Sequence, residues 1–212
     1  MTHDVVRIPK FEPGPERGRL GFATAVSEEF RFLLELGFRL VELDVTFARY
    51  ETNRRFLNAF HGRGSFELGV EIGRWLDIRG ERREELLTLR DVMELERPAD
   101  GGYGEMSAMT PELVRKFVQQ LAAWTREFAI PLLTNGDYLF DRISTINAAR
   151  SQAELEQLEA SRLRAQADQA WRQRDFATVV SVYDEIDNEL PTVQLRPFER
   201  GRLDYARNLI GA

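Results

Sequence analysis

The sequence predicts an α+β protein: a four-stranded antiparallel meander sheet covered by helices, followed by a C-terminal helical hairpin and a closing helix. The clearest observation is the run FELGVEIGRW at residues 66–75, in which apolar residues alternate with polar residues or glycine. This period of two is typical of a strand with one buried face. The apolar runs before it are joined by very short connections, which favour antiparallel neighbours. We therefore expect residues 66–75 to form the central strand of the sheet.

Composition limits the classes of function. The 212 residues include 43% apolar side chains, 14 Phe and no Cys, and the formal net charge is −6. Such a chain can build a core, and it has no disulfide, thiolate zinc site or cysteine nucleophile. The acidic balance argues against sequence-independent binding to nucleic acid, and no apolar run is long enough to cross a membrane. We expect a cytoplasmic protein with no cofactor, no nucleic-acid partner and no membrane contact.

The chain begins with a predicted extended arm at residues 1–21, which is rich in proline and glycine. A helix is expected over residues 27–36, with Ser27 as the N-cap and Gly37 after the C-terminus.

The predicted meander follows this helix. Its first three strands are expected at residues 38–45, 46–52 and 55–61, with a tight turn at Asn53-Arg54. In the fourth strand, Gly69 and Gly73 fall on the polar face. They predict either a shallow trough or a β-bulge there.

Helices are expected to cover the sheet. Residues 77–83 are charged and predict a loop, and residues 84–95 predict a short helix. The glycine-rich residues 98–109 lack the lysine and hydroxyl residue of a P-loop and predict a surface connection. Thr110-Pro111-Glu112 is a helix start, and the helix it opens has an apolar stripe through Leu113, Phe117, Leu121, Trp124 and Phe128. A further short helix is expected over residues 138–149.

A second domain is predicted from residue 150. Ser151 and Glu154 have the spacing of a capping box, and the helix that they open should stop near Arg174. A second helix is expected over residues 175–190. The closing helix, residues 197–210, should cover the open side with the apolar residues Phe198, Leu203, Ala206 and Leu209. The predicted organisation is an arm (1–21), an α+β domain (22–149) and a helical domain (150–212).

Residues 167–191, ADQAWRQRDFATVVSVYDEIDNELP, resemble one tetratricopeptide repeat. The resemblance rests on Ala167 at the helix crossing, Asp175-Phe176 at the turn, Tyr183 in the second helix and Pro191 at its end. Val179 and Ile186 stand where that family usually has alanine, which implies a wider helix spacing. Because we find no second copy, the resemblance implies a structural hairpin.

The first domain, with its helix followed by FRLVELDVTFARYET and RFLNAFHGRGSFELGVEIGR, resembles a class of uncharacterised bacterial α+β proteins. Some of these are similar to immunity proteins encoded beside toxins. The resemblance implies binding to a protein partner, and it identifies no functional residue.

The polar face of the predicted sheet is the candidate binding site. It is expected to present six charged residues: Glu42, Asp44, Glu67, Glu71, Arg49 and Arg74. An acidic, patterned surface of this kind steers a basic partner and rejects wrong ones. We therefore expect a non-catalytic interaction protein, an immunity or accessory factor that binds a basic protein such as a nuclease toxin. We predict no catalytic residue and no metal site.

Two alternatives stay open. The first is a small-substrate or metal-dependent enzyme that uses His61 with Glu67 or Glu71. The two glutamates are four residues apart on one strand, roughly 13 Å, which is too far for a carboxylate pair that shares one proton. The second alternative is a homo-oligomeric structural protein whose contact is formed by residues 167–210.

Overall fold

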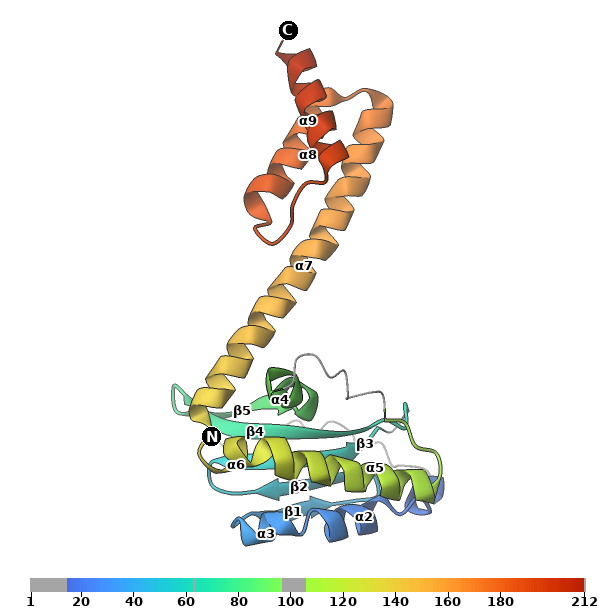
Figure 1. Ribbon diagram of the computed structural model, residues 1–212, viewed down its shortest axis with the longest axis vertical. Coiled ribbons are helices and arrows are strands. Elements are labelled where there is room, and N and C mark those ends of the chain that lie inside the picture. The colour runs from blue at the N-terminus through green and yellow to red at the C-terminus, as the bar shows by residue number, and fades with distance from the viewer. Residues whose placement is uncertain (1–14, 63, 97–105, 212) are drawn as a thin grey trace, which may run out of the picture. The chain divides into compact units, whose positions relative to one another are not determined.

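The computed structural model describes residues 15–62, 64–96 and 106–211. The chain divides into two compact units, Met1–Ser144 (unit 1) and Thr145–Ala212 (unit 2). Unit 1 holds a sheet and its covering helices, and unit 2 is helical (Figure 1). Within the described residues, no helix combines the length and the apolar character that a membrane span requires.

The sheet of unit 1 is an antiparallel meander of five strands in the order β1-β2-β3-β4-β5. The α+β class and the antiparallel meander are confirmed, and the predicted number of four strands is wrong by one. The strands are β1 (Arg39–Leu43), β2 (Phe47–Glu51), β3 (Arg55–His61), β4 (Leu68–Ile78) and β5 (Glu81–Thr88).

Strand β4 has the predicted alternation. Leu68, Val70 and Ile72 are at most 1% exposed and face the core. The strand begins at Leu68, two residues later than expected, because Phe66 has a positive φ of 56° and cannot continue an extended strand.

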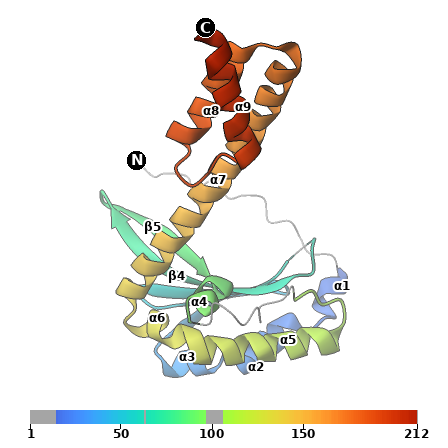
Figure 2. The same ribbon diagram turned by 45° about the horizontal axis from the view of Figure 1, so that its top comes forward.

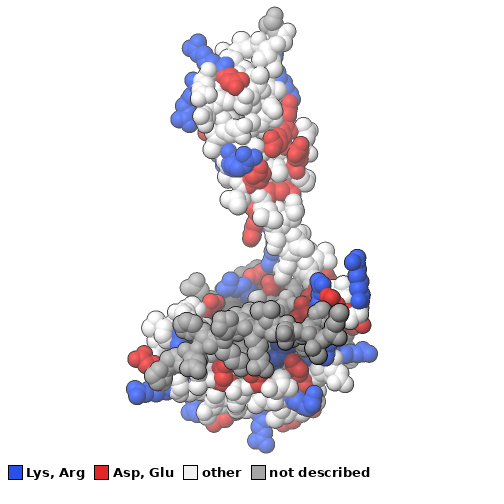
Figure 3. All heavy atoms as spheres, turned by 180° about the vertical axis from the view of Figure 1, so that it is seen from behind, with Lys and Arg blue, Asp and Glu red and all other residues white. Residues whose placement is uncertain are grey.

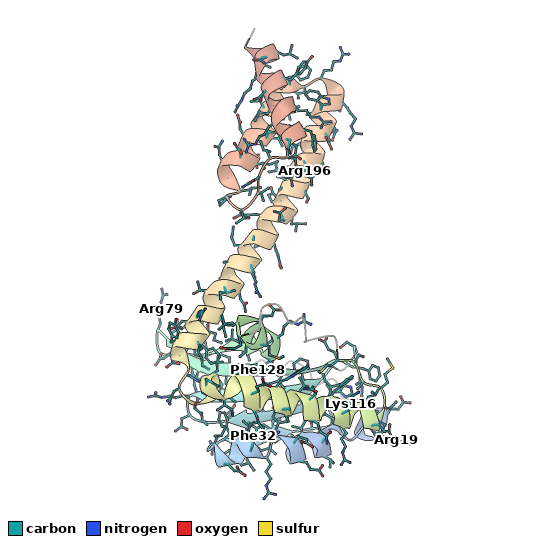
Figure 4. The ribbon with its side chains drawn as sticks, in the orientation of Figure 1. Arg19, Phe32, Arg79, Lys116, Phe128 and Arg196 are labelled. Carbon is teal, nitrogen blue, oxygen red and sulfur yellow. The ribbon has the colours of Figure 1, made fainter. Side chains whose placement is uncertain are left out.

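Strand β5 replaces the loop and the first turn of the helix predicted over residues 77–95. β4 and β5 are joined by a tight turn in which Arg79 and Gly80 both have positive φ, as in the two-residue hairpin turns that match strand twist (Figure 4 labels Arg79). The remainder of the predicted helix is α4 (Leu89–Glu96). β5 is an edge strand with charged residues on both faces, a common protection against edge pairing.

The N-terminal helices differ from the prediction. Residues 1–14 of the predicted arm lie outside the described residues, and α1 (Pro15–Gly18) is a short helix. The single helix expected over residues 27–36 is two helices, α2 (Phe22–Glu29) and α3 (Phe32–Glu35). Ser27 is inside α2, where its hydroxyl donates to the carbonyl of Ala23, so it is not an N-cap. Gly37 does end α3 with a φ of 83°, as predicted.

Helix α5 (Pro111–Trp124) begins as predicted, with the Thr110 hydroxyl accepting a hydrogen bond from the Leu113 backbone N–H. It continues through a π-helical turn, η1 (Thr125–Ala129), into α6 (Ile130–Thr134). The buried stripe of α5 is shifted from the predicted one and consists of Val114, Val118, Leu121 and Ala122. Figure 2 shows α2, α3, α5 and α6 together on one side of the sheet. Residues 98–105 of the predicted glycine-rich connection lie outside the described residues.

Unit 2 takes its first helix from α7 (Asp137–Gln173), which has 37 residues. The predicted end at residue 149 and new start at Ser151 are wrong, because no glycine or proline breaks the chain between Asp137 and Gln173. α8 (Phe176–Glu189) is capped by Asp175, and α9 (Pro197–Ile210) has the predicted bounds. The core of unit 2 includes Ala167, Val179, Tyr183, Ile186, Leu203 and Ala206.

Candidate functional site

The buried apolar side chains of the helices in unit 1 pack against one face of the sheet. No described helix contributes core residues to the opposite face, which we call the open face. Strand register places the following described residues on it: Arg39 and Glu42 (β1); Phe47, Arg49 and Glu51 (β2); Phe56, Asn58 and Phe60 (β3); Gly69, Glu71, Gly73, Trp75 and Asp77 (β4); Arg82, Glu84, Leu86 and Thr88 (β5). Carboxylates outnumber guanidinium groups in this set. Figure 3, a view from behind, shows acidic and basic side chains around the borders of that side of unit 1.

A polar row crosses the middle of the open face. Direct cross-strand pairing joins Glu42 to Arg49, Arg49 to Asn58, Asn58 to Glu71 and Glu71 to Thr88. Side chains of directly paired residues lie on the same face about 4.5–5.5 Å apart at Cβ. The polar row therefore brings together three of the predicted site residues: Glu42, Arg49 and Glu71.

Two phenyl rings flank the polar row. Phe60 pairs with Gly69 and Phe56 pairs with Gly73, and each ring lies over its glycine. A Cβ atom added to Gly69 would come within 2.3 Å of the Phe60 ring, and one added to Gly73 within 2.1 Å of the Phe56 ring. The two glycines therefore form neither a trough nor a bulge, because rings from β3 fill the space above them.

Arg49 stacks on this aromatic surface. Its guanidinium carbon lies 4.0 Å from the Phe56 ring centroid and 5.3 Å from that of Trp75. Its nitrogens donate to Glu51 at 2.5 Å and to Glu84 at 2.7 Å. Two carboxylates thus neutralise Arg49, and the arrangement shows that the open face can hold a guanidinium group between rings and carboxylates.

Glu71 has a different environment. The only hydrogen bond that the described residues give its half-buried carboxylate comes from the side-chain amide of Asn58, whose Nδ2 donates to Oε2 at 3.1 Å. This bond fixes the amide orientation, because a carboxylate accepts only from the nitrogen. The other amide atom, Asn58 Oδ1, is buried and accepts no hydrogen bond from any described residue, although Asn58 is only 4% exposed. An unsatisfied buried acceptor costs about 1–3 kcal/mol. Among the described residues, a carboxylate that no cation pairs with and an acceptor that receives no hydrogen bond therefore lie beside each other.

Two other predicted site residues lie beyond the ends of the strands that define the open face. Asp44 is in the β1–β2 turn, where it accepts hydrogen bonds from the backbone and hydroxyl of Thr46. Glu67 is exposed and precedes β4. Neither residue belongs to a strand, so the alternation does not fix the side on which it lies.

The placement of Arg74 on the polar face is wrong. Position 74 has the same parity as Ile72 and faces the helices, where Arg74 is 9% exposed. Its guanidinium is ion-paired to Glu85 and Asp141 and lies 5.1 Å from the Phe140 ring centroid. Arg74 therefore helps to attach the start of α7 to the sheet. Burial lowers the pKa of Arg74, and the hydrogen bonds and charges of Glu85 and Asp141 together outweigh burial and raise it.

His61 and Glu71 lie on opposite faces of the sheet, so the predicted grouping of His61 with Glu71 does not form. His61 pairs with Leu68 on the helix-covered face and is 1% exposed, with Nε2 2.9 Å from the carbonyl oxygen of Ala108. Burial lowers the pKa of the imidazole, which keeps it neutral at neutral pH. Over residues 15–62, 64–96 and 106–211, no group of three His, Asp or Glu side chains is arranged to hold a metal ion.

Asn58, Phe56, Phe60 and Trp75 were not predicted as site residues. The sequence of β3 carried a signal for Asn58 and Phe56. Its apolar residues alternate with no polar set and fall on both faces of the strand, which indicates that the face opposite the helices also has packed side chains. Comparison with protein-family models, curated proteins and solved structures found no match to this chain.

Proposed function

We propose that this protein is a non-catalytic binding protein whose open face receives a basic side chain, most favourably an arginine, of a partner protein. The observation that carries the proposal is the pair formed by the Glu71 carboxylate and the unsatisfied Oδ1 of Asn58. An incoming guanidinium group can donate to the half-buried Glu71 carboxylate and lie against the half-buried Phe60 ring. It reaches the buried Oδ1 of Asn58 only when the side chains around that atom move aside. Arg49 makes the corresponding contacts two strands away from Glu71.

The charge of the open face supports the same partner. The carboxylates of Glu42, Glu51, Glu71, Asp77 and Glu84 exceed the guanidinium groups of Arg39, Arg49 and Arg82. Such a surface raises the association rate of a basic protein and disfavours an acidic one. A role as an immunity or accessory factor, which neutralises or accompanies a basic partner, would use this surface.

The proposal is tested by measuring the affinity of the protein for a peptide of alternating arginine and glycine, with a glutamate–glycine peptide of the same length as comparison. Calorimetry should detect binding of the arginine–glycine peptide and no binding of the glutamate–glycine peptide. Glu71→Gln keeps the side-chain shape and removes the charge. A hydrogen bond to a charged group contributes about 1.5–3 kcal/mol, so the dissociation constant should rise about ten- to a hundredfold.

Glu67→Gln is the matched control, since it makes the same chemical change at an exposed glutamate that precedes β4 and is not part of the polar row. It should leave the dissociation constant within about twofold, and thermal melting should show that both variants stay folded. Equal binding of both peptides, or equal losses in the two variants, would refute the assignment of the open face.

A further inference from the structure

Unit 2 carries an unexplained pocket at one end of its helices. The aromatic pocket is lined by Trp171, Arg174, Phe176, Tyr205 and Leu209 and has a volume of about 440 Å³. These residues come from the C-terminal end of α7, the start of α8 and the end of α9, which lie side by side (Figure 1).

The walls of the aromatic pocket are ordered by ring contacts. The Trp171 and Tyr205 centroids are 5.6 Å apart, and those of Phe176 and Tyr205 are 5.9 Å apart. Tyr205 and Leu209 are nevertheless 54% and 46% exposed. The outer helix of a stacked helical array normally presents a polar surface to water. The apolar outer side of α9 therefore indicates that another chain covers it.

Arg174 gives the aromatic pocket a positive charge. Its side chain makes no hydrogen bond or ion pair with any described residue. Arg174 also has a φ of 59° at the end of α7, a left-handed conformation that favours glycine. A guanidinium group at the edge of an apolar pocket suits a ligand that has an acidic group next to an apolar one.

The same unit presents a surface of complementary chemistry, which we call the leucine ridge: Glu154, Leu155 and Leu158 of α7. Leu155 and Leu158 are 62% and 71% exposed. Glu154 has no hydrogen bond or ion pair with any described residue. The leucine ridge thus offers two apolar side chains beside an unpaired carboxylate, and the aromatic pocket offers an apolar hollow beside an unpaired guanidinium.

We propose that the leucine ridge of one copy of this chain docks in the aromatic pocket of a second copy, with Glu154 paired to Arg174. The two surfaces cannot meet within one copy. At 100° per residue, Trp171 lies about 160° around α7 from Leu155, on the other side of the helix. The contact is therefore head-to-tail, and each copy keeps one unused surface that can add a further copy.

Complementation between two variants tests the contact. Leu155→Gln with Leu158→Gln removes the ridge, and Tyr205→Gln with Leu209→Gln removes the pocket. Sedimentation velocity of the wild type should show a mean mass that rises with concentration, while each variant alone stays monomeric. A mixture of the two variants should form a one-to-one pair and nothing larger, because only one intact ridge–pocket contact is available.

A charge exchange tests the ion pair. Arg174→Glu should weaken self-association about tenfold, and the chain that carries both Arg174→Glu and Glu154→Arg should recover it. Leu113→Gln on α5 is the matched control, because it removes a 38% exposed leucine from unit 1 and should change nothing. A wild type that stays monomeric at all concentrations, or variants that associate as the wild type does, would overturn the proposal. Circular dichroism should show that the variants are folded, and the ridge variant leaves the packed rings of the pocket untouched.

Discussion

Replacing Gly73 by alanine tests the packing of the open face directly. The added Cβ would lie 2.1 Å from the Phe56 ring, far inside normal contact distance. That ring is 0% exposed and lies between Arg49 and Trp75, so it has little room to move. The steric conflict should therefore destabilise unit 1.

The magnitude follows from two opposing effects. Overpacking of a well-filled site costs about 1–3 kcal/mol. Replacing a glycine inside a strand recovers about 0.5–1 kcal/mol of backbone entropy. The difference runs from about 0 to 2.5 kcal/mol. Because the new Cβ would come within 2.1 Å of the ring, we expect a net loss of about 1–2 kcal/mol, which lowers the midpoint of unit 1 by about 3–6 °C.

The assay must report on unit 1 alone, because a chain with two units need not unfold in one step. The indole N–H signal of Trp75 in NMR spectra suits this purpose, since the Trp75 ring lies 5.1 Å from that of Phe56. Gly69→Ala should cost less, because Phe60 is only half-buried. Gly64→Ala is the control, since a Cβ there meets nothing within 4 Å.

A double variant isolates the cause. Phe56→Leu removes the ring edge that meets the new Cβ, so Gly73→Ala should add little further loss in that background. An alanine at position 73 that leaves the midpoint unchanged or raises it would refute the ring-over-glycine packing.

Two further predictions concern charged groups. Arg74→Met should destabilise unit 1 by about 2–3 kcal/mol, less than the loss of a fully buried ion pair, because Asp141 is 66% exposed. The urea midpoint of unit 1 measures this loss of stability. An unchanged midpoint would contradict the role of Arg74 in attaching α7 to the sheet. In unit 2, hydrogen bonds from Thr192, and then from Gln152, lower the pKa of Glu156 from 4.5. The stability contributed by Glu156 is therefore present above about pH 4.5 and lost as pH falls through the folded-state pKa. In Glu156→Gln, the melting midpoint of unit 2, measured at a series of pH values, should fall less steeply below about pH 4.5 than in the wild type.

The sequence predicts the central strand of the meander because the apolar residues of β4 alternate. Leu68, Val70 and Ile72 have to face the core, and that requirement is visible in the order of residues alone. The same pattern could not predict β5, because β5 is an edge strand in which Leu87 is the single fully buried residue. Its sequence is compatible with a charged loop, and the pairing with β4 decides its conformation. The Arg79-Gly80 turn was the available signal.

Parity also explains the errors in the candidate site. Arg74 follows Ile72 by two residues and must share its face, although a buried arginine is unusual unless it is paired. Its partner Asp141 is 67 residues away in the chain, so the pairing could not be read from the local sequence. The polar row likewise depends on the register of five strands, which is set by tertiary pairing. The capping-box spacing at Ser151 suggested a helix start. The sequence on both sides of Ser151 favours a helix and has no glycine or proline, so α7 continues through this position.

The most direct test of the central claim is to locate the bound arginine peptide on the isotope-labelled protein by NMR. The account predicts that backbone and side-chain signals of Asn58, Glu71, Phe60 and Trp75 change during the titration, in the wild type and in Glu67→Gln. These changes should be lost in Glu71→Gln. Changes confined to the helix-covered face, or changes that persist without the Glu71 carboxylate, would contradict it.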